Sequence, residues 1–424
     1  MDTKSANFKK WFTFAILVLG AGTIYKVASL KSAFYVPMQE FMGLSHTQIG
    51  TATGVWSTIA SFGFIFSVYI SDKFSKKIML PLALILTGFL SIWLATFPSF
   101  KVILFIYAMF GITCDMLYWP ILLKSVKSLG DDHEQGRLFG FLEGGRGLVD
   151  TIVAFIGLGI FAWLGSSALG LKSSIWFFAI AMIVIGIISY FCLEHDEKVV
   201  VDQTEKTKGD TMAVVKATLK MPEVWLVSFT IFFVYGMYCG LVYFLPFLEE
   251  IYALPVALVG AYGIINQYGL KILSGPVGGV LADKKFKSPS KFLRFSFVVG
   301  VIVLGLFTFL PHKVLGIYTG MILTLVIGTI IFAMRAVFFA PMGEIKIPNE
   351  MSGAAMSIGS FIGYAPGIFA YTLYGNILDN NPGLKGYQIV FLIMCGFGVA
   401  GFIVSNLLVK KFKKSKSNGM TFQK

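Results

Sequence analysis

Apolar residues fill most of this chain in long runs that short polar segments interrupt. Each run approaches or exceeds the roughly 20 residues that a helix needs to cross about 30 Å of hydrocarbon. The pattern predicts twelve membrane-spanning helices, at approximately 11–38, 47–71, 78–97, 102–124, 137–164, 174–194, 223–249, 257–282, 291–311, 315–341, 353–375 and 388–409. The expected fold class is therefore an all-α membrane protein.

Composition supports a bilayer environment and narrows the chemistry. Apolar residues make up 56% of the 424 residues and charged residues only 13%, far from the usage of a soluble domain. The first apolar run is longer than a signal-peptide core and no small-residue cleavage pattern follows it, so it should remain as the first span. The four cysteines show no paired spacing and the four histidines stand in predicted loops. We expect no disulfide framework, metal site or cofactor.

Basic residues are distributed unevenly over the predicted loops. Of the 35 lysines and arginines, the predicted outer loops hold only Lys101, Lys172, Lys313 and Lys385. Both termini should therefore be cytoplasmic, because the cytoplasmic loops of membrane proteins carry the excess of basic residues. The net charge of +13 then reflects topology at the inner leaflet. It gives no reason to predict a nucleic-acid partner.

The chain contains an internal repeat. A polar segment at 195–222 separates a first half, 1–194, from a second half, 223–424, that ends in a basic tail. Three pairs of stretches recur in the same order: YVPMQEF and YFLPFLEE, YISDKFSKK and GVLADKKFK, DMLYWP and RAVFFAP. Repeats of this kind predict two pseudo-symmetric bundles of six helices joined by a cytoplasmic linker, an organisation common among transporters.

One of these stretches carries a family resemblance. GVLADKK, from Gly279 to Lys285, resembles the loop motif of the major facilitator superfamily, and its first-half copy has Val68 and Ser75 in place of the motif's glycines. The resemblance extends over the whole chain, since the number of spans and the central linker also fit. It implies a secondary active transporter in which spans one, four, seven and ten line a central cavity. The departure at Val68 puts close packing of spans two and eleven in doubt.

Three further stretches resemble a narrower group. EQGRLFGFLEGGRG from Glu134, the YWP of span four and the run from Ile347 to Phe369 are similar to bacterial permeases often described as nitrate- or sugar-acid-transporter-like. Gly367 stands where many of those proteins have an acidic residue. This resemblance implies transport of a solute across a bacterial cytoplasmic membrane and leaves the solute open.

The repeated loop motif suggests a conformational latch. Asp72 and Asp283 end spans two and eight beside basic residues, with Lys76 and Gly279 in the same motifs. An aspartate there can pair with a neighbouring helix end in one conformation and release it in another. The alternative is that these are ordinary loop charges. We favour the latch for the aspartates and the ordinary interpretation for the lysines.

Two charged residues interrupt spans four and ten. Asp115 would lie about 20 Å from the outer end of its helix, where a charge costs at least about 2.5 kcal/mol unless it faces a partner or a wet cavity. Aligning YWP with FFA makes Arg335 its pseudo-symmetry mate. The two could exchange partners as substrate or a proton arrives, or they could form a permanent ion pair.

Other interior charges give further candidates. Lys26 in span one is expected to bind the substrate anion, whereas Lys31 can snorkel outward. Glu143, Arg146 and Asp150 share one stripe of span five. They could satisfy one another, or Arg146 could be a cavity cation whose partners switch when Glu143 or Asp150 is protonated.

Span eight adds Lys271, and spans seven and eleven offer Tyr235, Tyr238 and Tyr364 as hydroxyl donors or aromatic walls, although tyrosine at helical spacing is often only packing. The predicted substrate ligands are thus Lys26, Arg146, Lys271, Arg335, Tyr235 and Tyr238, and the predicted proton-coupling residues are Asp115, Glu143 and Asp150.

These residues favour transport of a small organic anion. The interior holds slightly more cations than anions, which favours an anionic solute. The alternative is a proton-coupled carrier of a neutral sugar, or a drug-efflux pump. No nucleophile, metal-ligand or phosphate-loop motif suggests an enzyme. We expect a monomer in the lipid bilayer, with proton symport and anion exchange both open.

Overall fold

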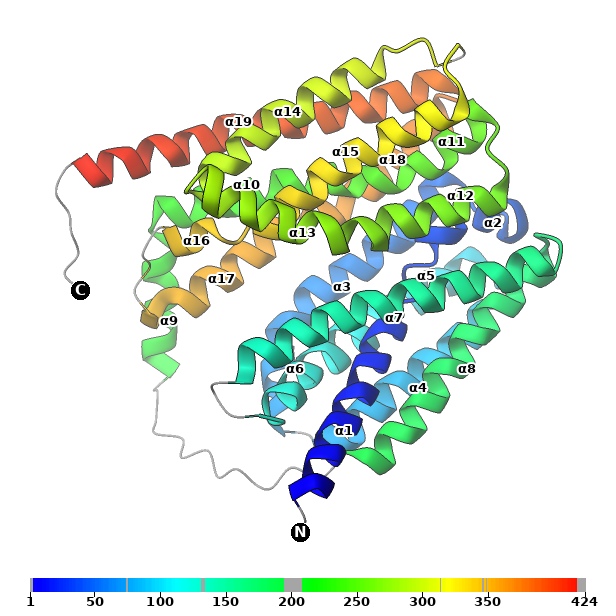
Figure 1. Ribbon diagram of the computed structural model, residues 1–424, viewed down its shortest axis with the longest axis horizontal. Coiled ribbons are helices and arrows are strands. Elements are labelled where there is room, and N and C mark those ends of the chain that lie inside the picture. The colour runs from blue at the N-terminus through cyan, green and yellow to red at the C-terminus, as the bar shows by residue number, and fades with distance from the viewer. Residues whose placement is uncertain are drawn as a thin grey trace. The chain divides into compact units, whose positions relative to one another are not determined.

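Helices and turns make up the described part of the chain. The computed structural model describes residues 3–73, 75–130, 134–193, 208–312, 314–344, 347 and 349–417, and no strand occurs among them. Within these ranges ten helices or runs of helices are long and apolar enough to cross a membrane. The other two predicted spans coincide with α1 (Thr3–Thr23) plus α2 (Lys31–Met42), and with α3 (His46–Lys73). The all-α membrane fold is thereby confirmed (Figure 1).

The chain divides into two compact units, each described here by itself. Unit 1 comprises Met1–Val200 and Ala253–Gly269, and unit 2 comprises Val201–Tyr252 and Leu270–Lys424. The first part of the eighth predicted span is thus grouped with the first half of the sequence. Residues 195–207 of the predicted linker lie outside the described residues, and its remainder consists of α9 (Lys208–Leu219) and the short connection to the next helix.

Unit 1 contains α1 to α3 and the following elements: α4 (Lys76–Leu94), α5 (Phe100–Phe110), the π-helix η1 (Gly111–Tyr118), α6 (Trp119–Lys127), α7 (Gln135–Trp163), α8 (Ala168–Cys192), α12 (Val256–Ile264) and η4 (Ile265–Gly269). Helices α4 and α8 run side by side, and α1 packs on α7 and α8. Gly22 allows the close approach of α1 and α7, because a Cβ there would lie 2.6 Å from the side chain of Val149.

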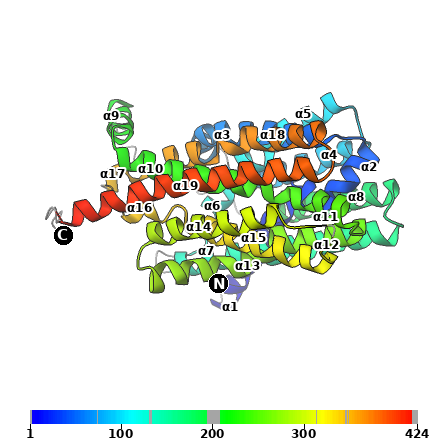
Figure 2. The ribbon, with the colours of Figure 1, turned by 90° about the horizontal axis from the view of Figure 1, so that it is seen from above.

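Unit 2 contains α9 and α10 (Pro222–Gly240), η3 (Leu241–Tyr243), α11 (Phe244–Tyr252), α13 (Leu270–Val280), η5 (Leu281–Lys285), α14 (Pro289–Thr308), α15 (Ile317–Val337), α16 (Pro341–Glu344), α17 (Asn349–Tyr364), α18 (Pro366–Asn380) and α19 (Leu384–Ser417). Helix α19 lies between α10 and α14, and α13 packs on α15 (Figure 2). Gly363 brings α17 against α10, since a Cβ there would lie 2.4 Å from Ile231.

The first predicted span is not one continuous helix. Helix α1 ends at Thr23 and α2 begins at Lys31, with turns over 24–30. The Thr23 hydroxyl donates to the Leu19 carbonyl at 2.7 Å, and Lys26 N–H bonds the Thr23 carbonyl three residues back. Such bonds bend a helix and tighten its last turn. The prediction of one continuous helix over 11–38 is therefore wrong, and Lys26 lies in the break.

Candidate functional site

The break in the first span presents two neighbouring side chains to two different partners. Tyr25 contacts the π-helix η1, and Lys26 contacts α7 and η4. In a regular helix these side chains would diverge by 100° and lie at fixed heights. The turns over 24–30 release that constraint. This short irregular segment therefore organises the polar interior of unit 1.

Lys26 is almost fully buried, at 3% exposure, and its charge is balanced inside unit 1. Its ammonium forms a salt bridge with the Asp150 carboxylate, donates to the Asp150 backbone carbonyl at 2.6 Å and lies 3.9 Å from the centre of the Tyr268 ring. A buried lysine needs such a set of partners because its desolvation is costly. In this conformation Lys26 joins the break, α7 and η4.

Asp115 has hydrogen-bond donors around it instead of a cation. The Trp56 indole N–H donates to its Oδ2 at 2.7 Å, and the Tyr25 hydroxyl lies 3.3 Å from its Oδ1. The same hydroxyl lies 3.1 Å from the Cys114 backbone carbonyl. Among the described residues no lysine or arginine forms an ion pair with Asp115. Its predicted mate Arg335 belongs to unit 2.

The π-helix at Asp115 has a local cause in the sequence. Pro120 has no N–H to give to the Met116 carbonyl four residues earlier, and its ring would clash with that group in a regular α-helix. Over Gly111–Tyr118 the chain widens to a π-helix, and the Trp119 N–H bonds the Cys114 carbonyl five residues back. Such wide turns often mark functional sites. The YWP motif thus shapes the backbone around Asp115.

Of the three residues in the predicted stripe on α7, two pair with each other. Arg146 donates to Glu143 at 2.9 Å, one turn away, and its guanidinium lies 4.9 Å from the centre of the Trp119 ring. Asp150 pairs with Lys26 instead of Arg146. Lys26 and Arg146, the two cations of unit 1 that were predicted as substrate ligands, therefore both have anionic partners in this conformation.

Unit 2 holds Arg335 against aromatic rings. Its guanidinium lies 4.1 Å from the centre of the Tyr238 ring and 5.8 Å from that of Tyr235. Tyr364 completes the group, since its ring meets the Tyr235 ring edge-on at 4.9 Å. We call Arg335, Tyr235, Tyr238 and Tyr364 the arginine–tyrosine cluster. Every member is half-buried, and within the described ranges no carboxylate forms a salt bridge with Arg335.

The remaining predicted ligand of unit 2 is less enclosed. Lys271, in the second residue of α13, is exposed, and its ammonium lies 5.9 Å from the Phe332 ring on α15. The Tyr238 ring meets the same phenylalanine at 5.6 Å. Lys271 and Tyr238 therefore share Phe332 as a neighbour, which puts Lys271 at the margin of the arginine–tyrosine cluster.

The latch residues are described only in part. Asp72 falls in α3, but its side chain lies outside the described set. Lys76 donates to the Ser128 hydroxyl at 3.1 Å, within unit 1. Asp283 is exposed on η5, and a Cβ on Gly279 would meet no atom within 4 Å. The latch stays a prediction.

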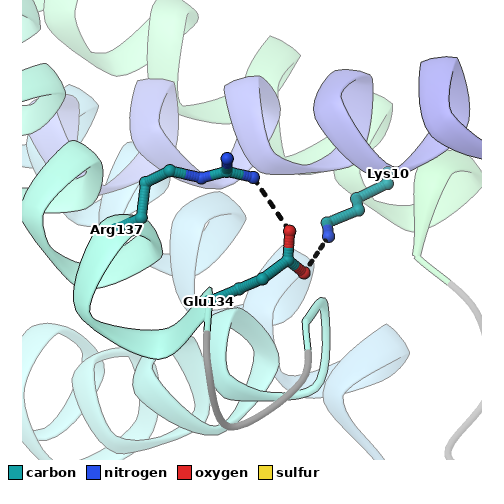
Figure 3. A network of polar contacts seen from close by, with 3 residues as sticks. All are labelled: Lys10, Glu134 and Arg137. Atoms are coloured by element: carbon teal, nitrogen blue, oxygen red, sulfur yellow. Dashed lines mark hydrogen bonds and ion pairs between the residues drawn. The ribbon is translucent and has the colours of Figure 1, made fainter.

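A charged group that the sequence reasoning missed ties the start of α7 to α1. Glu134 lies between Lys10 and Arg137, with oxygen–nitrogen distances of 2.5 Å and 2.8 Å (Figure 3). Both cations also face the Trp11 ring, at 6.0 Å and 5.4 Å. This arrangement clamps one end of unit 1 and does not touch the interior charges.

The sequence also gave no signal for four aromatic partners of the interior charges. These are Tyr25, Trp56, Trp119 and Tyr268. An aromatic residue in an apolar span is most simply interpreted as part of the hydrophobic packing. Only the folded structure shows which ring faces a charge. No cluster of three or more metal-ligating side chains occurs among the residues that could be searched.

Comparison with known proteins places the chain. Residues 12–371 match the model of the Major Facilitator Superfamily. The chain is 51% identical over 409 residues to the inner membrane protein YihN of Escherichia coli K12, covering 96% of this chain and 97% of that protein. It is 28% identical over 415 residues to the inner membrane protein YqcE of the same strain, covering 97% of each.

Two solved structures with a similar fold are described as a homologue of a transporter and as a transporter. The chain matches a bacterial homologue of the human lysosomal transporter Spinster in an inward-facing, unoccupied conformation, with a TM-score of 0.77 and 13% identity over 96% of this chain and 98% of that one. It also matches the nucleoside transporter NupG, with a TM-score of 0.72 and 15% identity over 94% and 99%. At these identities the likeness shows the fold alone.

Proposed function

Since the chain belongs to the Major Facilitator Superfamily, we propose that it is a secondary active transporter of a small organic anion, with Arg335 as the principal anion ligand. The family and fold are those of transporters rather than enzymes. The observation that carries the anion proposal is the stacking of Arg335 on Tyr238 without a carboxylate partner among the described residues.

The balance of charge supports an anionic solute. In unit 1, Lys26 and Arg146 have Asp150 and Glu143 as partners. In unit 2, Arg335 has aromatic faces, which attract a cation but leave its N–H groups available. A guanidinium presents a planar fork that binds a carboxylate through two parallel hydrogen bonds. An anion entering the arginine–tyrosine cluster would therefore supply the missing counter-charge.

The tyrosines suggest that the anion also carries polar groups. The Tyr235 and Tyr364 hydroxyls have no hydrogen-bond partner in the part of the chain that the structure describes. Both side chains are half-buried beside Arg335. Each hydroxyl can donate and accept, so a hydroxylated acid such as a sugar acid would satisfy them, together with the guanidinium. Lys271 would add long-range attraction at the margin of the site.

The wider predictions remain part of this proposal. The relatives YihN and YqcE are inner membrane proteins, and we propose the same membrane location for this chain. We further propose that both termini are cytoplasmic, from the distribution of basic residues over the predicted loops, and that the protein acts as a monomer by alternating access. Asp72, Lys76, Gly279 and Asp283 form the latch. Glu143, Asp150 and Asp115 are the candidates for coupling to protons, and of these only Asp115 lacks a described cationic partner.

Thermal stabilisation of the detergent-purified protein tests anion binding before the solute is known, because a ligand of the folded state raises its stability by mass action. The panel comprises sugar acids, carboxylates, sulfonates, phosphorylated sugars, nitrate and neutral sugars. We expect one anion class to stabilise the wild type and to lose this effect in Arg335→Ala. Arg294→Ala is the matched control, since Arg294 is also half-buried in unit 2 but bonds Asn406 at 3.2 Å. Stabilisation by neutral sugars alone, or equally in Arg335→Ala, would instead support the carrier of neutral solutes.

A further inference from the structure

If the Asp115 carboxylate is ionised, the polar contacts around it outnumber the hydrogens that its neighbours can donate. Three polar contacts meet there: the Trp56 Nε1 with Asp115 Oδ2 at 2.7 Å, the Tyr25 hydroxyl with Asp115 Oδ1 at 3.3 Å, and the same hydroxyl with the Cys114 carbonyl at 3.1 Å. The indole supplies one hydrogen and the phenol supplies one. One contact therefore remains without a hydrogen, and it would bring two oxygen lone pairs together.

A proton on Asp115 completes the set. With the proton on Oδ1, the carboxyl O–H donates to the Tyr25 hydroxyl, that hydroxyl donates to the Cys114 carbonyl, and the indole N–H donates to the remaining oxygen Oδ2. Each of the three contacts then has one hydrogen. The arrangement depends on the break in the first span, which places Tyr25, and on the π-helix, which places the Cys114 carbonyl.

We infer that Asp115, Tyr25 and Trp56 form a proton-binding site in which the Asp115 carboxyl is protonated in this conformation. Its occupancy couples solute movement to protons, and this consequence rests on the proposed transport function. The inference selects symport with protons over exchange of one anion for another, and it selects Asp115 over Glu143 and Asp150, which both have cationic partners.

The charges around the site permit this proton to leave and return. On release, the Tyr25 hydroxyl turns from the Cys114 carbonyl to the ionised Oδ1, while the Trp119 N–H continues to satisfy that carbonyl. Arg146 on α7 is a cation beside Trp119: its guanidinium lies 4.9 Å from the centre of the Trp119 ring, and that ring meets Tyr25 edge-on at 6.4 Å. Cys114 itself is the other titratable neighbour, and its thiol contacts Thr87 and Thr113.

The helices packed against η1 carry their described charges away from its middle. On α3, α4, α5 and α6 the described charged residues lie near the helix ends, in a set comprising His46, Lys76, Lys77, Lys101, Lys124 and Lys127. Asp115 is half-buried, and both of its carboxyl oxygens have polar partners. A proton is therefore the counter-charge that this neighbourhood most readily provides.

Infrared difference spectroscopy of the purified full chain detects the proton without any solute. We expect the carbonyl stretch of a protonated carboxylic acid in the wild type, shifted in heavy water and lost as the pH is raised. It should be absent from Asp115→Asn and retained in Asp150→Asn and Glu143→Gln. Tyr25→Phe should move the band to higher frequency, because the carboxyl O–H loses its acceptor. A purely structural role for Tyr25 would leave the band unmoved.

An absent band, or one that persists unchanged in Asp115→Asn, overturns the proton site. Asp115→Asn keeps an amide of the same shape that can accept from Trp56 and donate to Tyr25, so misfolding is not expected, and the thermal midpoint checks this. The anion panel is read separately. If the infrared band is present but no anion stabilises the protein in an Arg335-dependent way, the proposed anion transport is wrong and the proton site stands. If an anion stabilises the protein in that way but the band is absent, the proton site alone is wrong.

Discussion

Lys26 and Asp150 are joined twice, through a salt bridge between their side chains and through a bond of 2.6 Å from the Lys26 ammonium to the Asp150 backbone carbonyl. The lysine comes from the break in the first span and the aspartate from the middle of α7. The same ammonium lies over Tyr268 of η4. A single buried charge thus holds three separate segments of unit 1 together.

Removing Asp150 from this pair should lower the stability of the fold more than removing Lys26. The Lys26 side chain is 2% exposed and that of Asp150 is 21% exposed. Asp150→Asn leaves a buried cation without its counter-ion and should destabilise the protein by about 3–5 kcal/mol, whereas Lys26→Met leaves a carboxylate that water reaches and should cost less. Unfolding in denaturant measures both.

The double variant Lys26→Met with Asp150→Asn provides the control for this pair. It removes both charges, so much of the stability lost in Asp150→Asn should return. Strictly additive losses would mean that the two residues do not depend on each other, contrary to the contact described.

Tyr238 should matter for its ring face and not chiefly for its hydroxyl. The Arg335 guanidinium lies 4.1 Å from the ring centre, a distance typical of cation–π stacking. Tyr238→Phe should keep anion affinity close to that of the wild type. Tyr238→Leu should weaken it by roughly 1–2 kcal/mol, or about 5- to 30-fold. Titration of the stabilising anion by thermal shift compares the two, and equal losses would assign the effect to the hydroxyl.

Glu134 should contribute modestly to the stability of unit 1. Its carboxylate bridges Lys10 and Arg137, and all three side chains are at least partly exposed. Exposed pairs contribute about 0.2–1 kcal/mol each, so Glu134→Gln should lower the unfolding free energy by about 1 kcal/mol, and less at high salt. A loss that does not depend on salt would show that the effect is not one of ion pairing.

His312 makes unit 2 sensitive to acid. It lies between α14 and α15, is 2% exposed, contacts the Tyr252 hydroxyl at 2.9 Å and is packed by Phe247 and Phe307. Burial lowers the pKa of this histidine below its usual value. The unfolded chain therefore binds more protons below about pH 6.5, and stability should fall as the pH drops through that value.

The His312→Gln variant checks this expectation, since a glutamine keeps a hydrogen-bonding group but does not titrate. Its thermal midpoint should vary less with pH than that of the wild type between about pH 7 and pH 5. Parallel curves would assign the acid sensitivity to other groups.

The sequence predicted the membrane spans far better than it predicted the contacts of their charges. The length of a span is set by the bilayer thickness, and the length and apolarity of each run can be read directly from a single sequence. The break at 24–30 was missed because no proline or glycine stands within it, and the helix bends through hydrogen bonds of the Thr23 hydroxyl and carbonyl that composition does not reveal. The pairing of Lys26 with Asp150 follows from that break, so it too was beyond the sequence.

Aromatic partners were missed for a different reason. Asp115 and Arg335 stood out because a charge in an apolar run is rare and costly. Trp56 and Tyr25 did not, since the chain holds 7 tryptophans and 17 tyrosines and most such rings only pack. Tyr238 was predicted as a substrate ligand, and its ring lies against the Arg335 guanidinium. Its role in binding the solute stays a prediction.

Uptake into proteoliposomes tests the central claim most directly. The solute is the labelled anion that stabilises the purified protein best, and the proteins compared are the wild type, Arg335→Lys and Arg294→Ala. We predict that the wild type and Arg294→Ala take up this anion, whereas Arg335→Lys, which keeps the charge but loses the planar fork and its stacking, does not. Equal uptake by Arg335→Lys, or uptake of neutral sugars in place of the anion, would contradict the assignment of this transporter to small organic anions.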